Sequence, residues 1–329
     1  MRRREFITLI AGAAAWPLGA RAQQPGSLRK VGMLINGDET DPEWKAYLAA
    51  FVQGLRSLGS VEGQNLRIEK RLSIGEPTIA RESATELLRF SPDVIFSSGT
   101  ANLTALLRQA PTMPIVFVQV SDPVAQGFIS NLAHPEGNIT GFSAYEFTIG
   151  GKWIDLLKQV APGLARVSLI FNPDTAPQSK FFLSSVEAVA PALGVQVTAA
   201  PVHDAADIER AVANSSSQPN GGLIFPTDAF LTLHRKLIVE TAARHRMPSM
   251  YNSRVFAEAG GLMSYGIDYE SVFRQAAIYV DRILRGAKPS SLPVQGPSKF
   301  SFVINVKAAK ALGLEVPMSL LFNADDYIE

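Results

Sequence analysis

Short apolar runs alternate with amphipathic stretches along most of the chain. Residues 31–35 predict a first buried strand, and the apolar positions behind it are spaced by three or four residues, which predicts a helix that Gly59 ends. These helix positions are Trp44, Leu48, Phe51, Leu55 and Leu58. The next predicted elements are strands at 66–71, 94–96 and 115–120 and helices at 77–89 and 101–109. Consecutive βα units of this kind predict a parallel sheet with helices on both faces.

The same pattern restarts after a loop rich in Pro and Gly at residues 121–138. The predicted strands are 139–143, 167–171, 195–199 and 221–225, and the predicted helices are 149–160, 178–193, 207–213 and one that ends near Arg244. Beyond Met250 we expect a strand at 261–265, a helix at 269–285, a connector at 286–297, a strand at 300–305 and a short helix at 306–312. The fold class is therefore α/β, with two Rossmann-like lobes built on parallel sheets and joined by a multi-strand hinge.

The order of the elements suggests how the chain divides. We expect lobe 1 to comprise residues 28–121 and 251–287, and lobe 2 to comprise residues 139–250 and 298–329. Residues 122–138 and 288–297 are expected to be hinge or connector segments, and a further crossing is expected at 250–253. About 305 residues of mature chain exceed what one core usually serves, which favours two domains.

The N-terminal residues 1–24 have the layout of a bacterial export signal. Arg2, Arg3 and Arg4 precede an apolar run from Phe6 to Leu18, and Ala20-Arg21-Ala22 is a small-x-small cleavage signature. The Arg3-Arg4-x-Phe pattern resembles the twin-arginine type. A short membrane anchor is the alternative, but the run is shorter than the roughly 20 residues that span a bilayer. We expect cleavage near Ala22 and a periplasmic protein.

Composition removes several classes of function. The chain has no Cys, so disulfides, thiolate metal sites, thiol catalysis and a lipoprotein anchor are excluded. Hydrophobic residues make up 47% and charged residues 19%, as in an ordinary packed globular protein. Removing the four arginines and the one glutamate of the signal changes the net charge from +1 to about −2. Nothing in this charge balance attracts polyanions, so we expect no nucleic-acid partner. We also expect the protein to be a monomer.

The motifs of common enzymes are missing. No Gly-x-Gly-x-x-Gly follows a predicted strand, and there is no P-loop and no Gly-x-Ser-x-Gly elbow. The four histidines have no partner at helical spacing, and His234 and His245 are about three turns apart on one predicted helix. We therefore expect no metal, no cofactor and no catalysis.

In open α/β sheets, ligands bind beyond the carboxyl ends of the strands, so a cleft between two such lobes is the expected site. Ser98, Gly99, Thr100 and Ala101 lie where a strand meets a helix N-terminus, which suits a carboxylate, although an ordinary N-cap is the alternative. The other candidates in the loops are Asn36, Asp41, Asp122, Ser143, Tyr145, Asn172, Thr227, Asp228, Tyr251 and Tyr265.

The side chains of these candidates have different uses. Asp228 follows a buried strand and can pair with an ammonium group, and an N-cap of the next helix is an equal alternative. Trp44, Tyr145 and Tyr265 can stack on an aromatic or apolar ligand, although core packing is favoured for Trp44. Asn36 and Asn172 can bind polar groups, or can simply be turn residues.

A series of short motifs, in order along almost the whole chain, carries a resemblance to a known family. They are Arg3-Arg4-Glu5-Phe6-Ile7, Val31-Gly32-Met33-Leu34, Pro92-Asp93-Val94-Ile95, Ser98-Gly99-Thr100, Val120-Ser121-Asp122-Pro123-Val124, Asn138-Ile139-Thr140-Gly141-Phe142-Ser143, Leu284-Arg285-Gly286-Ala287-Lys288-Pro289, Leu292-Pro293-Val294-Gln295, residues 300–305, and residues 308–314. The chain resembles the substrate-binding proteins of ABC importers with the type I periplasmic-binding fold, in the branch of tryptophan/tyrosine-type binding proteins.

The resemblance implies a two-lobed protein that closes on a small carboxylate or amino-acid-like ligand and delivers it to a permease in the inner membrane. It also implies that Ser98, Thr100 and Ala101 hold a carboxylate and that Asp228 holds an amino group. A sensor that passes its ligand state to a membrane receptor is the alternative, and an exported enzyme on a doubly wound fold is a further one. The sequence does not name the ligand, and amino acids and aromatic or aliphatic carboxylates stay open.

Overall fold

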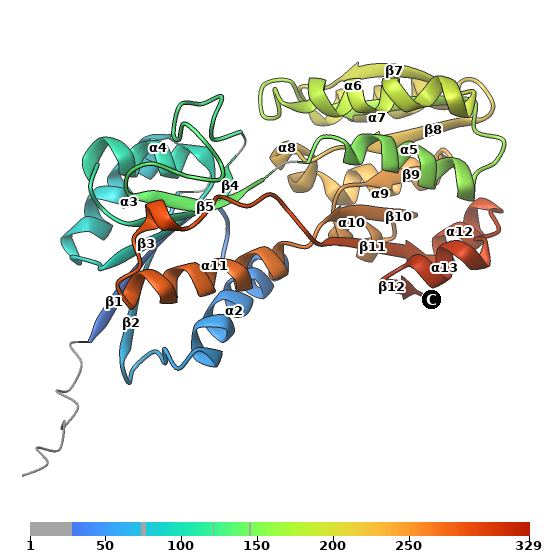
Figure 1. The fold of residues 1–329 in the computed structure, drawn as a ribbon. Helices are drawn as coiled ribbons and strands as arrows, with labels where there is room; N and C mark the ends of the chain where they lie inside the picture. The colour runs from blue at the N-terminus through green and yellow to red at the C-terminus, as the bar shows by residue number, and fades with distance from the viewer. Residues whose placement is uncertain (1–27, 74–76, 121, 145) are drawn as a thin grey trace, which may run out of the picture.

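The chain folds into two lobes that lie side by side, each built around its own sheet (Figure 1). The computed structural model describes residues 28–73, 77–120, 122–144 and 146–329, so the expected export signal lies outside the described residues. We call the five-stranded sheet and the helices that cover it lobe 1, and the seven-stranded sheet and its helices lobe 2. Expectation and structure agree on an α/β fold whose sheets are largely parallel.

Lobe 1 has strand order β2-β1-β3-β4-β5, and all its neighbouring strands are parallel. Its elements are β1 (Arg29–Ile35), α2 (Pro42–Ser57), β2 (Leu66–Leu72), α3 (Pro77–Arg89), β3 (Val94–Ser98), α4 (Thr100–Gln109), β4 (Ile115–Val120), β5 (Ile139–Ser143), α11 (Tyr269–Leu284) and the short 3-10 helix η2 (Pro289–Ser291). Alternate residues of β3 serve opposite faces of the sheet: Val94 and Phe96 pack with α2 and α11, and Ile95 packs with α3 and α4. Burial on both faces explains why β3 is an unbroken apolar run in the sequence.

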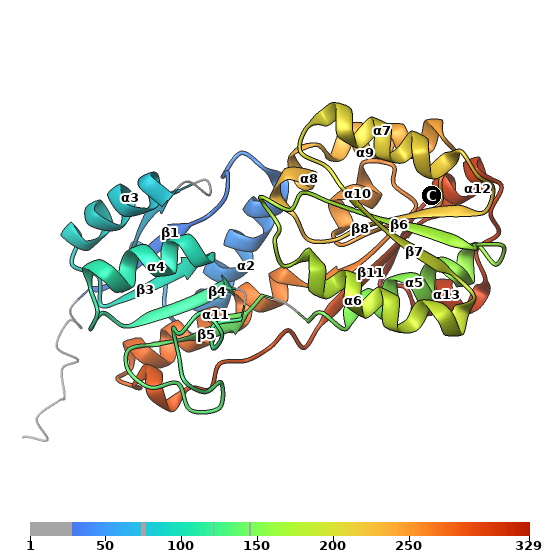
Figure 2. The same ribbon diagram turned by 90° about the horizontal axis from the view of Figure 1, so that it is seen from above.

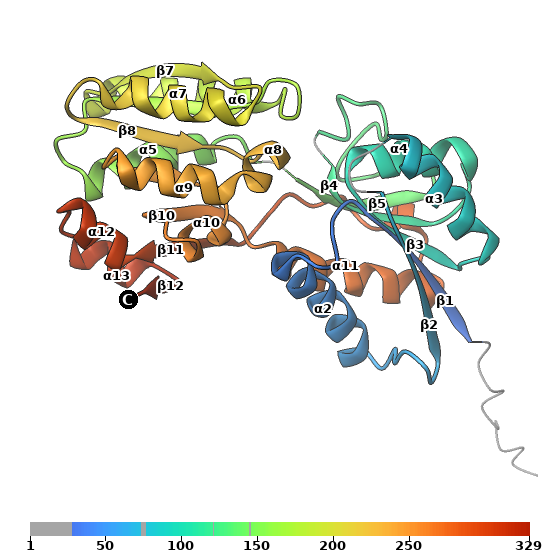
Figure 3. The ribbon, with the colours of Figure 1, turned by 180° about the vertical axis from the view of Figure 1, so that it is seen from behind.

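Lobe 2 has strand order β12-β11-β10-β9-β8-β6-β7, in which only the pair β10–β11 is antiparallel. Its elements are α5 (Ile149–Val160), β6 (Arg166–Phe171), α6 (Ser179–Val189), the 3-10 helix η1 (Ala190–Leu193), β7 (Gln196–Pro201), α7 (Ala205–Ser216), β8 (Gly221–Phe225), α8 (Ala229–Leu233), α9 (Arg235–Arg244), β9 (Ser249–Tyr251), α10 (Arg254–Glu258), β10 (Met263–Ile267), β11 (Phe300–Asn305), α12 (Val306–Leu312), α13 (Met318–Asn323) and β12 (Asp326–Ile328). Views from above and from behind show helices on both faces of this sheet (Figures 2 and 3).

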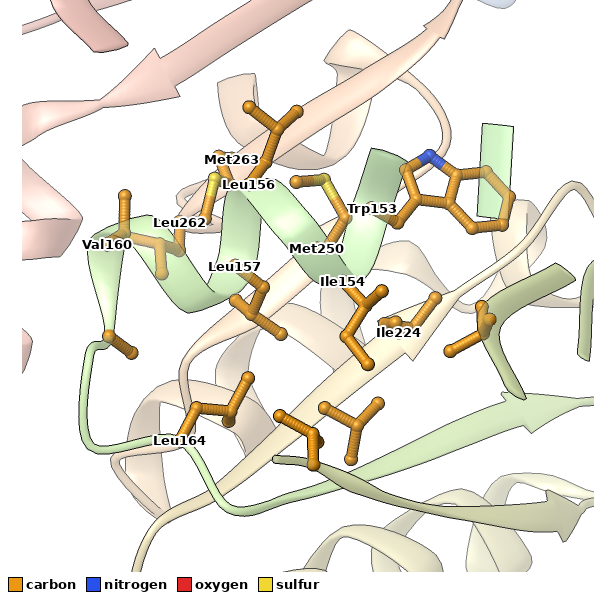
Figure 4. Close-up of a cluster of buried hydrophobic side chains, with 14 of the residues drawn as sticks. Trp153, Ile154, Leu156, Leu157, Val160, Leu164, Ile224, Met250, Leu262 and Met263 are labelled. Atoms are coloured by element: carbon orange, nitrogen blue, oxygen red, sulfur yellow. The ribbon is translucent and has the colours of Figure 1, made fainter. Parts of the chain in front are cut away.

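The larger core of lobe 2 lies under α5. Its apolar face carries Trp153, Ile154 and Leu157, which pack against Ile224 of β8 and Met250 of β9 (Figure 4). The helical spacing of these residues produces one continuous apolar stripe, and burying each large side chain of this kind stabilises the fold by roughly 1.5–3 kcal/mol. This stripe fixes α5 on the sheet, and Trp153 belongs to the N-terminal half of α5.

Three segments connect the lobes: the stretch between β5 and α5, the junction of β10 and α11, and the stretch between η2 and β11 (Figure 1). They are tied to one another by backbone hydrogen bonds. The Ser143 N–H donates to the Gln295 carbonyl at 2.9 Å, and the Asp268 N–H donates to the Lys299 carbonyl at 3.0 Å. The Lys299 ammonium also pairs with the Asp268 carboxylate at 2.9 Å. The linked segments therefore form the multi-strand hinge.

Several predicted boundaries need correction. Residues 139–143, expected in lobe 2, form β5 of the lobe 1 sheet, because Ile139 pairs with Ile115 of β4. Residues 251–267, expected in lobe 1, lie in lobe 2, where β10 pairs with β9 and β11. The loop 122–138 joins two neighbouring strands of one sheet and does not cross between lobes. Residues 250–253 are not a crossing either, because β9 is an inner strand of the lobe 2 sheet.

Besides the 3-10 helix η2, four short helices and strands were not predicted: β9, α10, α13 and β12. Each has six residues or fewer, too few for a periodic pattern to show. The predicted helix at 178–193 ends at Val189 and continues as the 3-10 turn η1. Pro191 lacks the N–H that an α-helix needs, which explains the change.

Candidate functional site

The carboxyl ends of the parallel strands of both sheets point toward the space between the lobes. In lobe 1 the loop after β1 and the helix after β3 lie at this edge, and in lobe 2 it is formed by the loops after β6 and β8 (Figures 1 and 2). The two edges approach each other closely, since the Asp41 carboxylate in the loop of lobe 1 lies 3.5 Å from the Arg235 guanidinium of lobe 2. The candidate site is the cleft between these edges.

The lobe 1 side of the cleft is the start of α4. Its N-cap is Gly99, which has no side chain to cap the helix, and the first backbone bond of the helix is from the Leu103 N–H to the Gly99 carbonyl. The N–H groups of Thr100 and Ala101 precede that bond and point out of the helix end. Thr100 is half-buried beside them. This geometry fits the predicted carboxylate site better than the alternative of an ordinary side-chain N-cap.

Asn36 and Ser98 hold the loop after β1 against this helix end. The Asn36 N–H donates to the buried Ser98 hydroxyl at 2.8 Å, so the Ser98 oxygen is engaged within lobe 1. Gly99 has φ +84°, and a Cβ there would lie 2.9 Å from Asn36 Nδ2. Only glycine fits this conformation and this close approach. Asn36 and Ser98 therefore position the start of α4, and Thr100 and Ala101 provide the N–H groups that point out of it.

Two other predicted residues, Asp122 and Ser143, make local contacts within the protein. Asp122 is exposed with φ +34°, and its carboxylate accepts the Ala125 N–H at 2.9 Å, so it shapes a turn. The Ser143 hydroxyl faces the Gln295 carbonyl at 3.5 Å within the hinge. Tyr145 lies outside the described residues.

The lobe 2 side of the cleft contains a small hollow of about 10 Å³, roughly the room that one water molecule needs, which the sequence did not predict. It is lined by residues of α5, α6, the crossings and the loops after β8 and β9: Glu146, Ile149, Trp153, Phe182, Thr227, Asn252, Gly266, Ile267 and Tyr269. The rings of Trp153 and Phe182 lie 5.1 Å apart. Three aromatic residues line this hollow, and a flat apolar group would fit among them only in a form whose lobes stand further apart.

Asn252 and Thr227 supply the polar part of this hollow. The Asn252 side-chain amide donates to the Thr227 hydroxyl at 3.3 Å, while its carbonyl oxygen is buried and has no hydrogen-bond partner. A buried acceptor without a partner costs about 1–3 kcal/mol, which a ligand donor can recover. Nearby, the Glu146 carboxylate accepts the Thr148 hydroxyl at 2.6 Å. The predicted residue Thr227 therefore lies in the site beside Asn252, which sequence reasoning missed.

Asp228 is the N-cap of α8, as one of the two sequence alternatives proposed. Its buried carboxylate accepts three protein donors: the Phe230 N–H at 2.8 Å, the Asn172 N–H at 2.8 Å and the Thr175 hydroxyl at 2.7 Å. The Asn172 side chain in turn accepts the Asp174 N–H at 2.8 Å, so Asn172 is a turn residue. These bonds join the loops after β6 and β8 and leave Asp228 as a structural residue.

Two predicted tyrosines belong to the core of lobe 2. The Tyr251 ring is completely buried between Phe225 and Phe256, with ring centroids at 5.2 and 4.9 Å, and its burial raises the pKa of its hydroxyl. Tyr265 stacks on Phe300 at 5.6 Å. The expectation that these side chains contact a ligand is wrong, because both rings point into packed layers. Only the Tyr265 backbone reaches the site, where its carbonyl accepts the Trp153 indole N–H at 2.6 Å.

Asp41 and Glu43, at the start of α2, contact lobe 2. The Asp41 carboxylate caps α2 through the Glu43 N–H at 2.8 Å and also pairs with Arg235. The Glu43 carboxylate accepts the Ser253 hydroxyl of lobe 2 at 2.7 Å and the Tyr47 hydroxyl at 2.5 Å. Burial raises the pKa of Glu43, although these hydrogen bonds act in the opposite direction. Asp41 is therefore a cross-lobe contact rather than a free ligand group.

Trp44 packs as the sequence favoured. Its ring lies edge-on to Tyr47 and Phe273 at 5.8 and 6.0 Å, against the core of lobe 1.

Among the described residues, no group of three His, Asp or Glu is arranged to hold a metal ion. In the same part of the chain, no helix is long and apolar enough to cross a membrane.

The family model described as ABC transporter substrate binding protein matches residues 34–328. The chain belongs to this family. The resemblance carried by the sequence motifs is thereby confirmed.

Individual members of the family and solved structures agree with the fold. The tyrosine-binding protein of Clostridioides difficile (strain R20291) is 23% identical over 265 residues, which are 80% of this chain and 76% of that protein. A conserved domain protein from Vibrio cholerae has a TM-score of 0.79 at 27% identity, covering 91% of this chain and 99% of its own. The structure of an ABC domain from Streptococcus pneumonia in complex with L-Trp has a TM-score of 0.79 at 23% identity, covering 92% of this chain and all of its own.

Proposed function

We propose that this substrate-binding protein captures a free aromatic amino acid in the cleft between its lobes and delivers it to an ABC permease. The observation that carries the ligand class is the small hollow of lobe 2, whose lining includes three aromatic residues and Asn252, a residue with a buried and unpartnered amide oxygen. The relatives that bind tyrosine and L-Trp support the same ligand class.

The three parts of such a ligand match three parts of the cleft. Its ring would enter among Trp153, Phe182 and Tyr269 when the lobes move apart, because the hollow between them has room for about one water molecule as it stands. Its ammonium group would donate to the Asn252 carbonyl oxygen, with the Glu146 carboxylate nearby for the charge. Its carboxylate would bind the N-terminus of α4, at the N–H groups of Thr100 and Ala101. Asp228, whose carboxylate already has three protein donors, takes no direct part.

The division of these groups between the lobes explains how binding would close the cleft. The ring and ammonium subsites belong to lobe 2 and the crossings, whereas the carboxylate subsite belongs to lobe 1. A ligand that contacts both sides binds the closed form more tightly and shifts the population toward it. The linked crossings are the natural hinge for this rotation. Export directed by the N-terminal signal would place this cycle of ligand binding and closure in the periplasm. There, a permease would distinguish the closed form from the open one.

A binding screen tests the proposal. Thermal-shift measurements with L-tryptophan, L-tyrosine, L-phenylalanine, L-leucine and succinate should show stabilisation by the aromatic amino acids. Calorimetry with the best ligand should then show that Asn252→Ala weakens binding by about tenfold or more, because the ammonium loses a buried acceptor. Asn214→Ala, on an exposed position of α7, is the matched control and should leave binding unchanged. No aromatic ligand in the screen, or equal affinity in both variants, would refute the assignment.

A further inference from the structure

The start of α2 reaches across the cleft and contacts lobe 2 through two acidic side chains. Asp41 Oδ2 lies 3.5 Å from Arg235 Nη2, and the two side chains are only 22% and 34% exposed. Glu43 Oε1 accepts the Ser253 hydroxyl at 2.7 Å. These contacts do not belong to the three covalent crossings, so they form a separate, reversible connection between the lobes. We call the four residues the α2 latch.

Both ends of the α2 latch are held rigidly in their own lobes. The other oxygen of Asp41 accepts the Glu43 N–H as the N-cap of α2. On the opposite side, Arg235 Nη1 donates to the Thr232 carbonyl at 3.2 Å, which fixes the guanidinium at the junction of α8 and α9. Because few side-chain rotamers remain to be ordered when the contact forms, the pair loses less entropy than an ordinary surface ion pair.

The α2 latch also adjoins the aromatic hollow. Ser253 directly follows Asn252, which lines the hollow, and the Tyr47 ring that bonds to Glu43 packs against Tyr269 at 5.6 Å. The latch is therefore joined to Asn252 and Tyr269, two residues that line the hollow. This continuity joins the latch to ligand binding without any direct contact with the ligand.

We propose that Asp41, Glu43, Arg235 and Ser253 are positioning residues that hold the ligand-free lobes partly closed and so raise the affinity of the cleft. A cleft that is already partly closed loses less free energy when the ligand completes the closure. Loss of the latch shifts the ligand-free population toward open forms. The apparent dissociation constant then rises by the same factor by which the partly closed population falls. The expected change in ligand affinity rests on the proposed function, whereas the expected change in the distance between the ligand-free lobes does not.

Spin labels can report the lobe separation directly, because the chain contains no Cys and two labelling sites can be introduced cleanly. Exposed Arg108 on α4 and exposed Glu187 on α6 are suitable positions, changed as Arg108→Cys and Glu187→Cys. Pulsed electron double resonance of the ligand-free full chain then gives the distance distribution. Asp41→Asn keeps the helix cap but removes the charge, and Arg235→Gln removes the other partner.

Both single variants should move the distribution to longer distances, and the double variant should move it no further than either single one. Arg254→Gln is the matched control, because Arg254 pairs with Glu258 and Asp326 inside lobe 2 and should not change the separation. Calorimetry with L-tryptophan or L-tyrosine should show affinity lower by about 2- to 10-fold in the latch variants. Unchanged distances in the single variants, additive effects in the double variant, or an equal shift in the control would overturn the latch. If no aromatic amino acid binds, the proposed function fails, while the ligand-free distances still decide the latch.

Discussion

The indole N–H of Trp153 donates to the backbone carbonyl of Tyr265 at 2.6 Å. This bond joins α5 to the end of β10, next to the point where the chain crosses to lobe 1. It holds the Trp153 ring in one orientation beside the hollow, so that the aromatic wall of the candidate site is built before a ligand arrives. The same residue also belongs to the buried core of lobe 2, which couples the site to the stability of the lobe.

Trp153→Phe removes the donor and leaves the Tyr265 carbonyl without its partner. We expect a loss of about 1–3 kcal/mol in the free energy of unfolding, together with weaker binding of aromatic ligands. Urea denaturation and calorimetry measure the two effects. Trp44→Phe, at the edge of the lobe 1 core, is the control for removing an indole and should spare ligand binding. Equal effects of the two substitutions on affinity would contradict the role of Trp153 in the site.

Gly99→Ala tests the lobe 1 side of the cleft. The positive φ of Gly99 makes any side chain unfavourable by about 1–3 kcal/mol, and the new methyl group would also press on Asn36. Gly286→Ala is the matched control, because Gly286 has φ +99° but nothing within 4 Å of an added Cβ. Both variants should lose stability in urea, but only Gly99→Ala should weaken binding of carboxylate ligands. Unimpaired binding in Gly99→Ala would show that the N-terminus of α4 does not hold the ligand.

Asp228→Ala separates a structural residue from a ligand-binding one. Removal of the carboxylate leaves three donors without their acceptor, so we expect a loss of about 1–3 kcal/mol in stability. Asp228→Asn retains an oxygen for part of these bonds and should lose less. Urea denaturation ranks the three proteins. A fully stable Asp228→Ala protein that no longer binds an amino acid would instead support direct contact with the ammonium group.

Glu43 should make stability depend on pH. Its pKa is raised by burial, so the folded protein binds this proton more tightly than the unfolded chain does. The resulting stabilisation is present below the unfolded pKa and is lost as the pH rises through the higher folded value. Glu43→Gln cannot titrate, so wild type should lose stability relative to this variant as the pH increases from about 4 to about 8. Urea denaturation across this range measures the difference, and exposed Glu187→Gln is the control. A difference that stays constant with pH would contradict the raised pKa.

The repeated strand and helix pattern predicts most of the fold because long apolar runs and helical stripes are local signals. Residues 77–89, 115–120 and 149–160 have the expected elements within the same bounds. Which sheet a strand joins is not local, and β5 shows this. Its five residues fit either lobe, and only pairing with β4 assigns them to lobe 1.

The candidate site is only partly readable from the sequence. The start of α4 could be proposed from the sequence because a Ser-Gly-Thr turn after a buried strand has a recognisable backbone geometry. Apart from Thr227, the residues of the hollow were missed, because they come from the crossings, from a short loop and from helix faces that are typical of core packing. Asn252 follows β9, a strand of only three residues, and had no pattern to mark it. Tyr265 was chosen instead of Tyr269, since the sequence does not show which side of the crossing faces the cleft.

Calorimetry with matched ligands tests the central claim most directly. L-tryptophan or L-tyrosine should bind, whereas tryptamine or tyramine, which lack the carboxylate, and indole-3-propionate, which lacks the amino group, should bind at least about tenfold more weakly. That result requires a carboxylate subsite, an ammonium subsite and an aromatic subsite in one cleft. Equal affinity for the complete and the truncated ligands, or tighter binding of a ligand without a ring, would contradict the account.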